Sequence, residues 1–184
     1  KSMFTSAELK KLIYPLIIEQ ILAITVGMVD TVMISYAGEA AMSGVSLVDM
    51  INNLLISIFA AVATGGAVVV SQYLGSQNSK SASRAATQLI TVAFVIAAGF
   101  MLVSIIGNES ILRLLFGAIE SDVMDSACIY FLISAWSYPF LAVYNASAAI
   151  FRSMGNAKIS MKISIGMNIF NAIGNAILIF GLSM

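Results

Sequence analysis

Three acidic residues inside apolar stretches are the side chains of this sequence most able to do chemistry. Glu19 and Asp30 lie in a hydrophobic stretch near the amino terminus, and Asp49 lies in the next one. The nine Lys and Arg residues fall between these stretches or at their ends, so we expect no cation beside the three acids. A charge in hydrocarbon costs at least about 2.5 kcal/mol on insertion scales, so each carboxylate should face a cavity or the bundle interior and be protonated or hold a cation.

The spacing of the acids predicts how they are placed. Glu19 and Asp30 are 11 residues apart, which in a helix is three turns plus roughly 20°, so both should point off one face. Asp30 lies six residues before the end of its apolar stretch, and Asp49 about seven residues after the start of the next. At the rise of a helix, both should lie about 10 Å below the same membrane surface.

Carboxamides accompany the acids in two other stretches. Asn52 and Asn53 share a helical face with Asp49. The last apolar stretch carries a polar stripe with spacings of 4, 3 and 4, formed by Ser164, Asn168, Asn171 and Asn175. If the first and last helices are neighbours, a carboxylate and carboxamides at matching depth would make an oxygen-rich pocket that tolerates a cation.

Structural roles for these residues remain open. Asparagines in membrane helices often only hydrogen-bond to a neighbouring helix, which applies to Asn168, Asn52 and Asn53. Asp49 and Glu19 could instead be wetted from the outer and inner membrane surfaces. Asp30 has no comparably cheap structural use, so it is the leading functional candidate.

The elements that must position these residues are five apolar stretches of membrane-spanning length. They predict an all-α integral membrane protein, because only helices satisfy their backbone groups within one segment in lipid. Residues 111–116 are too short to span and predict an interfacial helical turn or a continuation of the third span. The expected spans form one transmembrane lobe over residues 1–184, at residues 12–36, 42–74, 85–106, 126–154 and 160–182.

Composition excludes most other classes of protein. The chain is 60% hydrophobic and 10% charged, with a mean hydropathy of +0.98, which is incompatible with a soluble globule. Nine basic residues balance nine acidic ones, so no basic surface exists for nucleic acid. With no His and a single Cys128, the chain cannot build a His/Cys zinc site, a disulfide or a Ser-His pair. We expect no enzyme and no cofactor, the pair of Asp30 and Asp49 being the weak exception.

The distribution of cations predicts the orientation. Eight of the nine Lys and Arg residues lie at the amino terminus or in the even-numbered loops, and Arg113 alone lies in an odd-numbered loop. Because Lys and Arg in short loops stay on the cytoplasmic side, the amino terminus should be inside.

Several short motifs, in order along the whole chain, resemble the multidrug and toxic compound extrusion (MATE) family. Tyr14-Pro15, the run from Thr25 to Met33 around Asp30, and Gly38-Glu39-Ala40-Ala41 are similar to that family's first helix and following turn. The later matches are Ala63-Thr64-Gly65-Gly66, Ser71-Gln72-Tyr73-Leu74-Gly75, Arg152-Ser153-Met154-Gly155-Asn156, Asn168 with Asn171, and Ile179-Phe180-Gly181.

The resemblance implies an architecture and a location. MATE proteins are antiporters of about twelve helices in two six-helix lobes, and they expel cationic or amphipathic drugs in exchange for sodium or protons. The chain would then be the first five helices of the amino-terminal lobe, lacking helix six and the second lobe. It would lie in the plasma membrane of a bacterium or archaeon, in contact with membrane lipid.

The resemblance also assigns roles. Asp30 matches the first-helix acid that binds the coupling ion, Asn171 matches a fifth-helix partner, and Pro15 matches a proline associated with bending. A Na⁺ site at Asp30 and Asn171 is therefore implied. Asn175 stands where many members have Asp, and Ala148 where some have Asn, which leaves the choice between Na⁺ and H⁺ open. Asp49 has no counterpart in the family pattern.

The expected function is ion-coupled efflux of amphipathic or cationic molecules by alternating access. One alternative is a lipid-linked saccharide flippase of the same superfamily, which would normally place basic residues in its cavity. Another is a membrane scaffold subunit that transports nothing.

Overall fold

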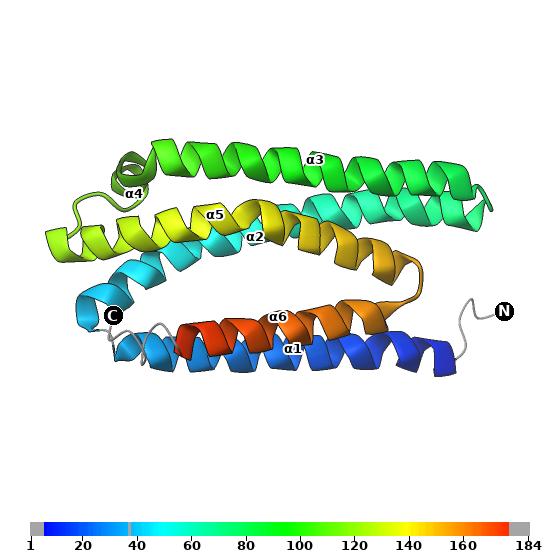
Figure 1. The fold of residues 1–184 in the computed structure, drawn as a ribbon, viewed down its shortest axis with the longest axis horizontal. Helices are drawn as coiled ribbons and strands as arrows, with labels where there is room; N and C mark the ends of the chain where they lie inside the picture. The colour runs from blue at the N-terminus through cyan, green and yellow to red at the C-terminus, as the bar shows by residue number, and fades with distance from the viewer. Residues whose placement is uncertain (1–5, 37, 177–184) are drawn as a thin grey trace. The chain divides into compact units, whose positions relative to one another are not determined.

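The computed structural model describes residues 6–36 and 38–176, with side chains described except at 6–8, 11, 12, 170–172 and 174–176. Within these ranges the chain is helical and contains no strand, which confirms the all-α prediction. In chain order the helices are α1 (Ser6–Ser35), α2 (Glu39–Gly75), α3 (Ser79–Ile106), α4 (Asn108–Phe116), α5 (Ser121–Ser153) and α6 (Ala157–Ala176) (Figure 1).

Four of the described helices are long and apolar enough to cross a membrane: α2, α3, α5 and the part of α1 from Ile13 to Ser35. They correspond to the first four expected spans. The fifth expected span, 160–182, corresponds to α6, which is described as far as Ala176. Residues 177–182 of that span lie outside the described residues.

The helices begin earlier than hydropathy predicts. The third begins at Ser79 instead of residue 85, because the Asn78 side chain accepts a hydrogen bond from the Ser81 backbone N–H at 3.1 Å and caps the helix. The fourth span begins at Ser121 instead of residue 126, and its first turn holds Asp122, whose charge favours a helix start. The expected starts were late because polar capping residues carry no hydropathy signal.

The short segment after the third span is a separate helix. After Ile106 the chain passes through Gly107, and α4 starts at Asn108. Arg113 and Glu109, one turn apart, form an ion pair of 2.7 Å along α4. Of the two alternatives left open by the sequence, a continuation of α3 is therefore excluded.

Two compact units make up the described chain. The first contains α1, α6 and the last turn of α5 from Phe151, and the second contains α2, α3, α4 and α5 up to Ile150. In the second unit, α2 and α3 lie side by side (Figure 1).

Close packing in the second unit depends on small residues. At Gly44 of α2, an added Cβ would lie 2.8 Å from the backbone nitrogen of Ala127 in α5. At Gly66 it would lie 2.3 Å from Leu89 Cδ1 in α3. Small residues at such positions let membrane helices approach closely. The Phe59 ring completes this core with an edge-to-face contact to Tyr138, at 6.3 Å between ring centroids.

In the first unit, α1 and α6 pack side by side and run in the same direction (Figure 1). A turn with Gly155 at φ +75° leads from α5 into α6, a backbone conformation that glycine adopts without steric cost. The pocket predicted from the sequence required the first and last helices to be neighbours, and the structure confirms this condition.

Candidate functional site

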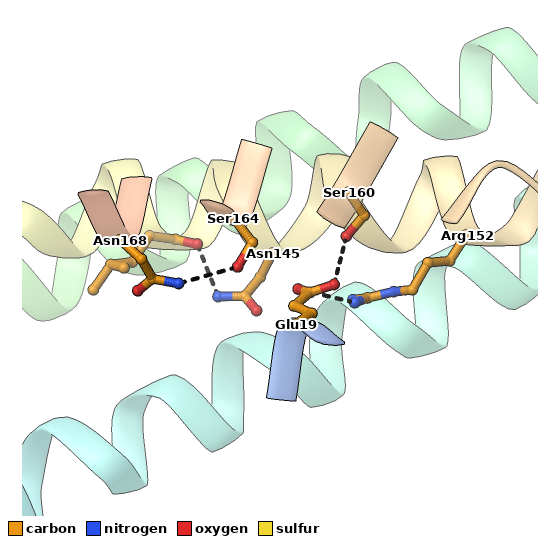
Figure 2. A network of polar contacts seen from close by, with 7 residues as sticks. Glu19, Asn145, Arg152, Ser160, Ser164 and Asn168 are labelled. Atoms are coloured by element: carbon orange, nitrogen blue, oxygen red, sulfur yellow. Dashed lines mark hydrogen bonds and ion pairs between the residues drawn. The ribbon is translucent and has the colours of Figure 1, made fainter. Parts of the chain in front are cut away.

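Glu19 lies at the centre of a polar network in the first unit (Figure 2). Its Oε1 is 3.8 Å from Nη1 of Arg152, in the last turn of α5. Its Oε2 accepts a hydrogen bond from Ser160 Oγ in α6 at 3.3 Å. The side chains of Glu19 and Arg152 are 17% and 35% exposed, and Ser160 is fully buried. Three elements therefore meet at one carboxylate.

This network corrects one sequence prediction. We expected no cation beside Glu19, because Arg152 belongs to the end of a span and not to its interior. The structure shows that this helix end lies next to α1 at the level of Glu19. The long Arg152 side chain can then reach the carboxylate, since its aliphatic stem lies along apolar surface while its charged end finds a partner.

The Glu19–Ser160 contact joins α1 to α6, which lie side by side. Eleven residues beyond Glu19 in α1 is Asp30, and eleven residues beyond Ser160 in α6 is Asn171. Both helices run in the same direction, so Asp30 and Asn171 each lie three helical turns beyond this contact on neighbouring helices. Asp30 is half-buried. The side chains of Asn171 and Asn175 lie outside the described residues, so their roles stay predictions.

The polar stripe of α6 begins earlier than the sequence analysis placed it. The half-buried Asn168 donates from Nδ2 to Ser164 Oγ at 3.4 Å, one turn away in the same helix. Ser164 and Ser160 are both buried, one turn apart. Ser160 was missed, although its spacing of four from Ser164 continues the stripe and could have identified it.

A second polar set lies between α2 and α5. Tyr130 Oη donates to Asp49 Oδ1 at 3.2 Å. Asn52 Nδ2 donates to Ser134 Oγ at 3.2 Å, and its Oδ1 accepts from Tyr138 Oη at 2.9 Å. Asn53 is exposed, and its backbone carbonyl accepts from Ser57 Oγ. Of the three polar residues predicted to share a face of α2, the structure thus brings Asp49 and Asn52 against α5.

Asn145 is a further polar residue that the sequence analysis passed over. Its Nδ2 donates to the backbone carbonyl of Leu141 at 2.9 Å, one turn earlier in α5. It is half-buried. A lone carboxamide among apolar residues was the available signal, but it lacked the periodic partners that identified the stripe of α6.

Both prolines lie inside helices, Pro15 in α1 and Pro139 in α5, and both are buried. Proline has no N–H to donate to the carbonyl four residues earlier, so each position weakens its helix locally. Pro15 is one turn before Glu19. A bending role for Pro15 stays a prediction.

No group of three or more Asp, Glu, His or Cys side chains that could hold a metal ion occurs in the part of the chain that the structure describes. A cation at Asp30 would therefore need hydroxyl, carboxamide or backbone oxygens as additional ligands. The structure has an open groove at the start of α3, which is lined by Ser79, Lys80, Ser83, Arg84 and Thr87. None of the predicted site residues lines it.

Long apolar helices that bury carboxylates, carboxamides and hydroxyls define a multi-pass membrane protein. The family is shown by a model described as MatE, which matches residues 15–177. The chain belongs to the MatE family.

Two relatives match almost the whole chain. The "Uncharacterized transporter YisQ" of Bacillus subtilis (strain 168) is 31% identical over 192 residues, covering 99% of this chain and 42% of the relative. The "Probable multidrug resistance protein NorM" of Thermotoga maritima is 26% identical over 177 residues, covering 95% of this chain and 37% of the relative. The chain thus spans about two-fifths of the length of these relatives.

Solved structures share the fold. A crystal structure of a MATE protein in complex with MaD3S matches with a TM-score of 0.89 at 17% identity, over 95% of this chain and 39% of that one. A transporter of the MOP superfamily from Pyrococcus furiosus, described as having a binding pocket of reverse polarity that suggests a different function, matches with a TM-score of 0.88 at 17% identity. It covers 95% of this chain and 38% of that one.

Proposed function

We propose that the intact protein exports amphipathic or cationic small molecules by alternating access, in exchange for Na⁺ or H⁺, with Asp30 as the coupling residue. The present chain would supply most of the amino-terminal lobe. The sixth helix and a second lobe would complete the substrate cavity, in the plasma membrane of a bacterium or archaeon.

The observation that supports the proposal is the packing of α1 beside α6. The half-buried acid Asp30 thus lies in an apolar helix that neighbours the helix carrying Asn171. Family membership and a relative named as a probable multidrug resistance protein support transport as the setting for this pair.

The chemistry of Asp30 fits a coupling role. A carboxylate in an apolar helix is more stable when it is protonated or holds a cation, so the bound ion changes the charge that α1 carries. An ion that binds one state of the transporter better than the other shifts the equilibrium between them. Asn171 and Asn175 would orient the carboxylate or supply oxygen ligands, and Asp49 would be an auxiliary acid.

Replacing Asp30 with Asn in the intact protein tests this proposal. Asn keeps the size and polarity of Asp but cannot gain or lose a charge, so we expect expression to persist and ion-driven efflux to be lost. Efflux of ethidium from proteoliposomes under separate Na⁺ and H⁺ gradients measures the effect and identifies the ion. Asp122→Asn, at an exposed position in the first turn of α5, is the matched control. Efflux by Asp30→Asn at the rate of the control would contradict the proposal.

A further inference from the structure

We propose that Glu19, Arg152 and Ser160 form an ionic latch that holds α1 against the junction of α5 and α6, and that Arg152 must leave Glu19 during each transport cycle. The latch rests on the proposed alternating-access function. It concerns the inner half of α1, 11 residues from the coupling residue Asp30.

The burial of the latch makes it a switch with two arrangements. An ion pair with the carboxylate only 17% exposed is weakly screened by salt, so its attraction persists under physiological conditions. Separating the charges leaves the Glu19 carboxylate in a poorly solvated place unless water or another cation replaces the guanidinium. Release of Arg152 therefore requires water or another cation to take its place beside Glu19.

The two sides of the latch are held unequally. Glu19 is fixed by its second oxygen, which accepts from the fully buried Ser160. Arg152 keeps 35% of its side chain exposed and approaches Glu19 at 3.8 Å, a longer contact than the 3.3 Å hydrogen bond from Ser160. An ion pair of this length is weaker than a guanidinium–carboxylate pair at hydrogen-bond distance. Arg152 is accordingly the side that releases.

The position of the latch connects it to movement of α1. Arg152 precedes the turn through Gly155 into α6, so its release frees the α5–α6 junction from α1. Pro15 lies one turn before Glu19 on the same helix and interrupts the backbone hydrogen bonding there. When ion binding at Asp30 moves α1, the Glu19–Arg152 contact would resist that movement.

The latch can be tested without transport. Spin labels at Leu9→Cys in α1 and Asn156→Cys in the turn before α6, on a Cys128→Ser background of the intact protein, report the separation of these two elements by pulsed electron resonance. Both positions are exposed. We expect Glu19→Gln and Arg152→Gln each to increase the long-distance population several-fold, and the charge-reversed pair Glu19→Arg with Arg152→Glu to restore the short one. Lys158→Gln, which removes an exposed charge near the junction, should leave the distances unchanged.

Each outcome decides the latch. If the single variants match Lys158→Gln, the latch is overturned. If they increase the separation but charge reversal does not restore it, the ion pair is again overturned, because local packing would then be the cause. If Arg152→Gln does not fold, Arg152→Lys replaces it in the test. Lys keeps the positive charge, so the latch requires this variant to keep the short distance. Since these distances need no ion gradient, a failed latch is distinguishable from a failed Asp30 assignment, which affects efflux alone.

Discussion

Asn52 and Asn53 are adjacent in α2 and carry the same side chain, yet they have different surroundings. Asn52 bonds to both Ser134 and Tyr138 in α5, whereas Asn53 is exposed. The contacts of Asn52 are those of interhelical hydrogen bonding, one of the two roles that the sequence left open.

Asn52→Ala should therefore lower the stability of the intact protein. Interhelical hydrogen bonds in membranes contribute about 0.6 kcal/mol each, so the loss of two should cost about 1 kcal/mol. Unfolding in a detergent titration measures this cost, with Asn53→Ala as the matched control. Efflux per folded molecule should be unchanged in both. Equal destabilisation by the two variants, or loss of efflux from Asn52→Ala at full stability, would contradict a purely structural role.

Helical spacing in the sequence predicted polar contacts better than the positions of Lys and Arg did. The spacing of four from Ser164 would have identified Ser160, which donates to Glu19, and the condition that the first and last helices are neighbours is met. Arg152 was missed as a partner of Glu19 because the two residues are far apart in the sequence, and only the folding of the first unit brings the last turn of α5 next to α1. The contact that a side chain at a helix end makes with a neighbouring element cannot be predicted from the sequence of one span.

At the scale of the elements, α2 and α5 lie close together at Gly44. The atoms that would obstruct a larger residue there include the backbone nitrogen of Ala127 and the backbone oxygen of Val123. Backbone atoms cannot rotate away as a side chain can. Gly65 lies in the same helix as Gly44, but an added Cβ there would have no atom within 4 Å.

Gly44→Ala should destabilise the protein by about 1–3 kcal/mol, because the new methyl group pushes α2 from α5. Gly65→Ala should be neutral or stabilising by up to about 1 kcal/mol, since Ala favours a helix more than Gly does. Detergent-titration unfolding of the two variants side by side gives the comparison. Destabilisation by Gly65→Ala comparable to that of Gly44→Ala would mean that lost glycine flexibility, and not close packing, is responsible.

Hydropathy located the elements well and their ends poorly. Each of the first four expected spans has a helix that is long enough to cross a membrane. The errors fall at Ser79 and Ser121, where helices begin in polar sequence. Hydropathy records what lipid requires of a segment, whereas helix ends are set by capping groups and backbone hydrogen bonds.

For the molecule as a whole, the distribution of Lys and Arg is the basis for orientation in the membrane. The turn between α2 and α3 is followed by Lys80 and Arg84, whereas the segment between α4 and α5 precedes Asp122 and Asp125. The predicted orientation places the first of these connections inside the cell and the second outside.

Single cysteines on a Cys128→Ser background test this orientation in cells expressing the intact protein. Ala118→Cys, between α4 and α5, should react with a membrane-impermeant maleimide added outside. Ser76→Cys, between α2 and α3, should react only after permeabilisation, because its loop is predicted to face the cytoplasm. Both positions are exposed. The reverse pattern of labelling would place the amino terminus outside.

The length of α2 adds a constraint from bilayer thickness. Its 37 residues make a helix roughly 55 Å long, which exceeds a hydrocarbon core of about 30 Å by about 25 Å. An average tilt of about 20° shortens the projection by only a few ångströms, so tilt cannot absorb the mismatch. Part of α2 must extend beyond the hydrocarbon. How far the α2–α3 hairpin carries Lys80 and Arg84 past the lipid headgroups is therefore governed by membrane thickness as well as by helix packing.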